Sequence, residues 1–250
     1  MALPKVGYPT YELELPSNGK TVKYRPFLVK EEKVLLLALE SEDEKQVVSA
    51  VKDLIKNCVI SRIKVDSLPL FDLEYLFLKI RGASIGETIT LTVTCLDDNE
   101  TKTEAVISVD DIKVFKPEGH STKIELTDEM GIVMRYPGMQ RFIELDFLQK
   151  ELNTEEVFEL IAESIDQIYD GEEVYDSSTT TLKEFRTFVD GLTTKQFESI
   201  QTFYQTSPKL RHTFTVVNPK TGVVKVQVTI PVEGLYSALE TERPLLLSTG

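Results

Sequence analysis

Hydrophobic and polar residues alternate with a period of two in three separate parts of the chain. This alternation places every second side chain on the same face of a β-strand, and a turn sequence interrupts each run near its middle. The pattern therefore predicts three antiparallel β-hairpins, which cover residues 11–27, 89–109 and 212–230. Two further short strands are predicted at 123–126 and 131–135.

Elsewhere hydrophobic residues recur at intervals of three and four, which is the spacing of one face of an α-helix. The helices predicted in this way are 29–39, 42–58, 70–81, 139–152, 154–168, 181–190 and 193–206. The Ser- and Thr-rich segment at 170–181 is the most polar in the chain, and we expect it to be a mobile loop. The predicted fold class is α+β, in which several antiparallel β-hairpins pack with about seven helices.

The predicted helix at 70–81 contains more hydrophobic residues than one buried face requires. At about 100° per residue, five of them form one broad face, and a second, smaller face carries Phe71, Tyr75 and Leu78. A helix that is apolar nearly all round is commonly buried between layers of its own protein. The alternative is that the smaller face docks a partner chain, because exposed aromatic patches tend to mark interaction sites.

The composition changes along the chain and indicates two regions. Up to Pro137 strands and helices are interspersed, whereas the part that follows is acidic and richer in predicted helices. We expect an N-terminal α+β region at 1–137 and a C-terminal helical region at 138–250, which the last hairpin closes. One continuous domain is the alternative.

The charge of the chain argues against two classes of partner. Its 250 residues include 41 acidic and 28 basic ones, which gives a net charge of −13. A negative field repels phosphate backbones and anionic membrane surfaces, so neither nucleic acid nor a membrane is expected as a partner. The first residues lack the pattern of a signal peptide, and both cysteines are expected to be reduced, as in a cytosol-like compartment.

Residue patterns that carry chemistry are sparse. Neither His120 nor His212 has a nucleophile or a metal ligand at helical spacing. Asp98 stands where a zinc-binding hairpin that began at Cys95 would need its second cysteine. The glycine motifs that bind phosphate do not occur. We therefore expect no enzyme, no bound metal and no cofactor, and a hydrolase is the disfavoured alternative.

Two segments carry a resemblance to a known family. They are YRPFLVKEEKVLLLALES at 24–41 and FDLEYLFLKIRGASIGE at 71–87. In them the chain resembles the baseplate hub assembly proteins of T-even-like contractile-tailed bacteriophages. The resemblance continues through 123–137 and more loosely to 206–222, and so covers most of the chain. Some members carry paired cysteines in the hairpin that holds only Cys95 here, and this departure removes any metal role that the resemblance would imply.

The resemblance implies a non-enzymatic role in building the phage tail. Such a protein assists assembly of the baseplate hub, which surrounds the central spike and the end of the tape measure, in the cytoplasm of the host cell. Its partners would be other baseplate hub and tail proteins. Two alternatives stay open: an assembly chaperone that leaves, and a structural subunit that is retained in the virion baseplate.

We expect the partner-binding residues to lie within the two segments that carry the resemblance. The first would contribute a charged and aromatic surface, and the second the border of its helix. The predicted residues are Arg25, Phe27, Lys30, Glu31, Glu32, Lys33, Phe71, Glu74, Tyr75, Arg81 and Glu87. The alternative is a structural role, with Phe27, Phe71 and Tyr75 in the core and the charges in intramolecular pairs.

Overall fold

The computed structural model describes residues 7–41, 43–95, 98, 100–138, 140–141, 152–222 and 224–229. The chain divides into two compact units, each with its own internal contacts. Unit 1 comprises Met1–Val65, Phe71–Phe115 and Lys209–Gly250. Unit 2 comprises Asp66–Leu70 and Lys116–Pro208.

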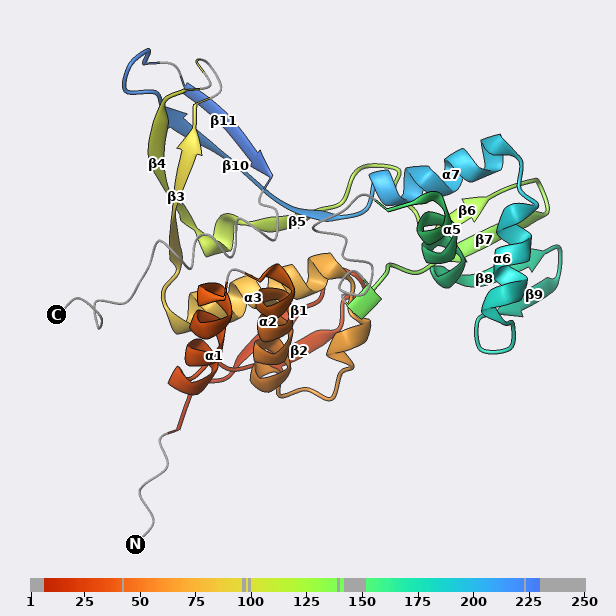
Figure 1. The fold of residues 1–250 in the computed structure, drawn as a ribbon, viewed down its shortest axis with the longest axis horizontal. Coiled ribbons are helices and arrows are strands. Elements are labelled where there is room, and N and C mark those ends of the chain that lie inside the picture. The colour runs from red at the N-terminus through yellow and green to blue at the C-terminus, as the bar shows by residue number, and fades with distance from the viewer. Residues whose placement is uncertain are drawn as a thin grey trace, which may run out of the picture. The chain divides into compact units, whose positions relative to one another are not determined.

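The described part of unit 1 combines helices with short antiparallel sheets (Figure 1). Its helices are α1 (Val29–Glu40), α2 (Glu44–Cys58) and α3 (Leu70–Ser84), with a 3₁₀ turn at Val109–Asp111; a second 3₁₀ turn, Val65–Ser67, lies where the chain leaves unit 1. Its strands are β1 (Tyr11–Glu14), β2 (Thr21–Tyr24), β3 (Thr88–Thr94), β4 (Lys102–Ser108), β5 (Lys113–Phe115), β10 (Lys209–Val217) and β11 (Val224–Thr229). The three predicted hairpins are present as β1–β2, β3–β4 and β10–β11.

Helix α3 is the most deeply buried element of unit 1. Its buried residues are distributed around the whole helix instead of along one face, as expected for a helix between layers of its own protein. Even a carboxylate on it is buried: Asp72 is fully inaccessible and accepts hydrogen bonds from the backbone N–H and the hydroxyl of Ser17. These bonds tie the turn between β1 and β2 to the first turn of α3.

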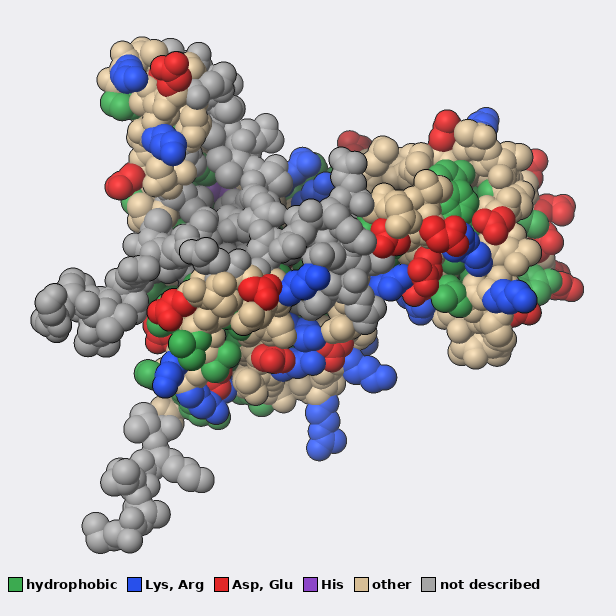
Figure 2. Space-filling model, viewed as in Figure 1, with side chains coloured by type: hydrophobic (Ala, Val, Ile, Leu, Met, Phe, Trp, Pro, Cys, Tyr) green, Lys and Arg blue, Asp and Glu red, His purple; other side chains and the backbone are tan. Residues whose placement is uncertain are grey.

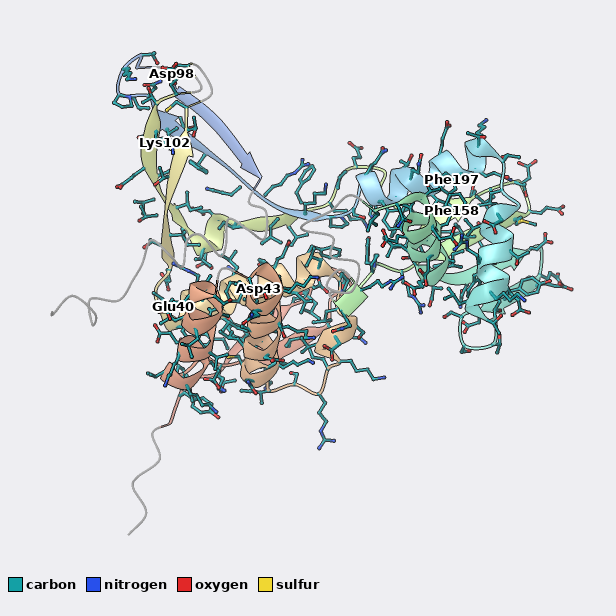
Figure 3. All side chains as sticks on the ribbon, viewed as in Figure 1. Glu40, Asp43, Asp98, Lys102, Phe158 and Phe197 are labelled. Atoms are coloured by element: carbon teal, nitrogen blue, oxygen red, sulfur yellow. The ribbon has the colours of Figure 1, made fainter. Side chains whose placement is uncertain are left out.

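The hairpins β3–β4 and β10–β11 lie side by side, and their tips are joined through Asp98 (Figure 3). Asp98 accepts hydrogen bonds from the hydroxyl and the N–H of Thr101, and its Oδ2 accepts one from Nδ2 of the buried Asn218 at 3.1 Å. The bonds from Thr101 are the main reason that the pKa of Asp98 is lowered. Asp98, the residue in the place of a second zinc-binding cysteine, thus links the two hairpins by hydrogen bonds.

Unit 2 is an antiparallel sheet with helices on one face (Figure 1). The strand order is β6 (Lys123–Glu125), β7 (Met130–Met134), β8 (Ile165–Asp170) and β9 (Glu173–Asp176). The helices of its described part are α5 (Thr154–Glu163), α6 (Leu182–Asp190) and α7 (Thr194–Gln205). Each begins with a capping box, which satisfies backbone N–H groups that the first turn leaves without a partner.

The core of unit 2 lies between the sheet and these helices. Phe158 of α5 and Phe197 of α7 stack at its edge with ring centres 5.0 Å apart (Figure 3). The buried residues of the cluster are Ile124, Ile132, Met134, Ile161, Ala162, Ile165, Ile168, Phe185, Val189, Ile200 and Phe203. They come from three strands and all three helices, so the unit has one continuous core.

The predicted helix at 154–168 is wrong beyond Glu163, because β8 begins at Ile165. Ile165 and Ile168 are spaced like residues on one helix face, and both are buried. A register shift explains this spacing: Val133 pairs with Gln167 but Met134 pairs with Ile165, so β8 holds one extra residue there. A β-bulge of this kind turns two side chains three positions apart toward the same core.

Three further predictions concern unit 2 and the helix count. The described part of the chain contains six α-helices, fewer than the seven predicted. The predicted helix at 139–152 lies almost entirely outside the described residues. The segment at 170–181, expected to be a loop, contains the edge strand β9.

The last hairpin pairs with the first half of the chain. Lys209 of β10 pairs with Phe115 of β5, so the hairpin that was expected to close a C-terminal region belongs to unit 1. A division into separately folding regions at 1–137 and 138–250 stays a prediction.

Candidate interaction surface

A buried ion pair fixes the start of α1. The guanidinium of Arg25 donates a hydrogen bond to Oε1 of Glu31 at 3.0 Å and another to the carbonyl of Asn57, at the end of α2, at 2.9 Å. Arg25 is 7% exposed and Glu31 is 5% exposed. The other carboxylate oxygen of Glu31 accepts the N–H of Leu28 at 2.8 Å, which caps the helix.

Both members of this pair stay charged. Burial opposes ionisation of Glu31, but the hydrogen bonds from Arg25 and from the Leu28 N–H outweigh it, and the pKa of Glu31 is lowered. Burial also disfavours the charged form of Arg25, yet its bond to Glu31 leaves its pKa raised. The pair therefore holds α1 in one orientation by charge-assisted hydrogen bonds.

The orientation of α1 places hydrophobic side chains in solvent. Glu31, Leu35 and Ala38 face inward. Outside this buried side Val29 is 79% exposed, and Val34 and Leu37 are each 54% exposed. We call these three residues, with the exposed Lys30 and Lys33 between them, the α1 outer face. Figure 2 shows hydrophobic and basic side chains together over α1.

The second segment of the resemblance is largely internal. Phe71 is 5% exposed and Arg81 is fully buried in α3. Tyr75 is partly exposed, and the ammonium of Lys79 lies 5.5 Å from the centre of its ring. The ammonium also reaches the carboxylate of Asp110, so this part of α3 is occupied by contacts within unit 1.

Glu74 of α3 is a partly buried carboxylate with a raised pKa. Burial raises its pKa to about 8, and the charge of Lys209 acts in the opposite direction. Both residues belong to unit 1. Between pH 4.5 and 8 this group therefore holds a proton in the folded protein that it releases in the unfolded chain.

The structure sorts the predicted site residues by exposure. Arg25, Phe27, Glu31, Phe71 and Arg81 are buried. The partly exposed ones are Glu32, Glu74 and Tyr75, and the exposed ones are Lys30, Lys33 and Glu87. Their role in binding a partner stays a prediction.

The two segments of the resemblance meet in unit 1. The N–H of Phe27, just before α1, donates to the hydroxyl of Ser84 at the end of α3 at 2.9 Å. The outer-face residues Val29, Val34 and Leu37 were not predicted. The signal for Val34 and Leu37 was the run of six hydrophobic residues at 34–39, which no helix can turn to a single face.

His120, one of the two histidines of the chain, is used in packing. In unit 2 the ring nitrogens of His120 lie 2.8 Å from the hydroxyl of Thr206 and 2.7 Å from that of Tyr136, and its ring stacks on Phe203. Burial, followed by the charge of Lys116, lowers its pKa. The described residues contain no group of three or more His, Cys, Asp or Glu arranged to hold a metal ion.

No helix in the described ranges is long and apolar enough to cross a membrane. A family model described as T4 bacteriophage base plate protein matches residues 8–235.

The chain belongs to this T4 bacteriophage base plate protein family. Membership makes it a protein of T4-like phage baseplates, and implies contacts with other baseplate proteins and a place in the virion or in its assembly. No curated protein and no solved structure matches the chain.

Proposed function

We propose that the protein is a non-enzymatic assembly chaperone of the phage tail, which assists assembly of the baseplate hub through protein–protein contacts. The observation that carries this proposal is the α1 outer face, where three hydrophobic side chains lie in solvent on a helix that a buried ion pair holds in place. The partners would be hub and tail proteins near the central spike and the tape measure, and the contacts would form in the host cytoplasm.

The rigid attachment of α1 supports a binding role for its outer face. A surface that is ordered before binding loses less conformational entropy when a partner docks. The buried half of the first segment, with Arg25 and Glu31, supplies this order, and the exposed half, with Val34 and Leu37, supplies the apolar contact. The two halves of one short segment thus have different tasks.

The distribution of charge also suits an assembly factor. Unit 2 contains 20 acidic and 8 basic residues, whereas unit 1 contains 21 acidic and 20 basic ones. Figure 2 shows acidic side chains spread over the visible face of unit 2. Repulsion between such units keeps copies of the protein soluble, while the nearly neutral unit 1 remains able to approach a partner.

The first experiment is co-purification of the tagged protein from infected cells, with the bound proteins identified by mass spectrometry. We expect hub proteins to be recovered with the wild-type chain and lost with Leu37→Asp. The matched control is Val174→Asp, because Val174 of β9 is 59% exposed and lies in unit 2. Equal recovery with both variants would contradict a role for the α1 outer face.

The second experiment separates the chaperone from a retained subunit. Purified virions are analysed by quantitative mass spectrometry beside the lysate of infected cells. A chaperone that leaves is abundant in the lysate and missing from the virion. A fixed number of copies in every virion would replace the chaperone with the alternative, a structural subunit of the hub.

A further inference from the structure

We infer that the partner of the α1 outer face is an amphipathic α-helix whose hydrophobic stripe is bordered by Asp or Glu. The inference rests on the proposed function, because it names the chemistry of the partner at the same surface. It draws on the spacing of the exposed residues, on their charges and on the absence of free backbone groups on this side of a helix.

The exposed residues follow the helical period. Val29, Lys33 and Leu37 are four apart, so they form one row along α1, and Lys30 and Val34 form a second row beside it. The row from Val29 to Leu37 spans about 12 Å, or two turns of helix. Side chains in rows of this kind interdigitate with the rows of a second helix that crosses them.

The charges between the hydrophobic residues are basic. Lys33 is exposed in the middle of the first row, and the Lys30 side chain is 72% exposed in the second. The Nζ of Lys30 lies 3.3 Å from Oε1 of Glu31, but the guanidinium of Arg25 binds the same buried oxygen. Of the acidic residues of α1, Glu32 is only partly exposed, and the exposed Glu40, the last residue of the helix, lies on the same side one turn beyond Leu37. A partner that meets Val34 and Leu37 therefore meets two lysines and needs acidic residues opposite them.

A helix fits this surface better than a strand. The backbone N–H and C=O groups in the middle of α1 are bonded within the helix, so an added strand would find no backbone partners there. Nucleic acid is a poor occupant, since two lysines on a chain of net charge −13 neutralise few phosphates.

Two synthetic peptides of about 18 residues test the charge requirement, a length at which a designed helix can form in water. Both carry Leu at heptad core positions, and the flanking positions are Glu in one peptide and Lys in the other. We expect the purified full chain to bind the Glu peptide about fivefold more tightly than the Lys peptide by fluorescence anisotropy. The ratio of the two affinities should approach one when about 0.5 M salt is added, because exposed charges are largely screened at that ionic strength.

Variants assign the binding to the α1 outer face. Leu37→Asp should weaken binding of the Glu peptide by about tenfold or more, because the contact loses its central hydrophobic group. The double variant Lys30→Glu with Lys33→Glu should reverse the preference between the two peptides. Val174→Asp should change neither value. Equal affinity for both peptides, or an equal loss with Val174→Asp, would overturn the inference.

A photo-crosslinking amino acid at position 37 identifies the natural occupant in infected cells. A crosslink to a helical segment of a hub protein with Asp or Glu beside its hydrophobic stripe supports the inference. A crosslink to a second copy of the chain, to residues 231–250 of the same chain, or to a segment without acidic residues overturns it.

The two proposals fail in different ways. Loss of hub proteins with Leu37→Asp, together with equal binding of both peptides, would leave the proposed function standing and remove the acidic helix. Normal recovery of hub proteins with Leu37→Asp would remove both.

Discussion

Helices α1 and α3 come from the two segments of the family resemblance, and both contain more hydrophobic residues than one helix face can hold. In α3 the surplus is covered, because Leu73 of the broad face and Phe71 and Leu78 of the smaller face are all buried. In α1 the surplus is exposed at Val29, Val34 and Leu37. The same sequence property therefore produces a central core helix in one case and a candidate docking surface in the other.

The difference arises from what surrounds each helix. Helix α1 packs against α2, and Arg25 joins the start of α1 to the end of α2 through its bonds to Glu31 and to the carbonyl of Asn57. Helix α3 meets the β1–β2 turn through Asp72, Asp110 through Lys79 and Phe27 through Ser84. A hydrophobic surplus thus becomes a surface only where the fold supplies no second layer.

The largest loss of stability is expected from a substitution in α3. Phe77 is 1% exposed, so Phe77→Ala removes a ring from the core and should lower the free energy of unfolding by about 3–5 kcal/mol. Urea denaturation followed by circular dichroism measures this change. A loss below about 1 kcal/mol would show that α3 does not hold the core together.

The next effect concerns the ion pair that orients α1. Glu31→Gln removes the charge opposite the buried Arg25 and should cost about 3 kcal/mol of unfolding free energy, because an unpaired buried charge remains. The double variant Arg25→Met with Glu31→Leu should recover part of the loss, since it leaves no buried charge. Denaturation of both variants under the same conditions gives the comparison, and a larger loss in the double variant would contradict it.

A pH dependence distinguishes the two helices further. The pKa of Glu74 is raised from 4.5 to about 8 in the folded protein, so stability is fully present below pH 4.5 and falls as the pH rises through 8. Glu74→Gln should remove this contribution, which is on the order of a few kcal/mol at most, and should be more stable than the wild type above pH 8. Denaturation of both proteins at several pH values is the measurement, and parallel curves would refute the shift.

The smallest effect is expected on the α1 outer face. Leu37→Ala removes a side chain that is 54% exposed and should change the free energy of unfolding by less than about 0.5 kcal/mol. The same variant should weaken recovery of hub proteins, so stability and binding would separate at this residue. A loss of stability as large as that of Phe77→Ala would mean that Leu37 belongs to the core.

Local patterning predicted much of the fold and less of the candidate site. The hairpins follow from alternation, and α1, α2 and α3 begin and end within a few residues of the predicted bounds. Strand β8 was missed because a bulge gives Ile165 and Ile168 a helical spacing. Among the predicted site residues, Arg25 and Glu31 turned out to be buried partners of each other, a pairing that depends on the end of α2.

The mixed α and β character, the hairpins, the hydrophobic surplus of two helices and the family can all be predicted from the sequence. These depend on the order of neighbouring residues, or on motifs that can be read along the chain. The packing of distant segments is needed to explain why the surplus of α3 is covered and that of α1 is exposed, and why the last hairpin joins β5 in unit 1. The reason is that burial is set by residues distant in sequence, and no local period records which of them will pack against a given face.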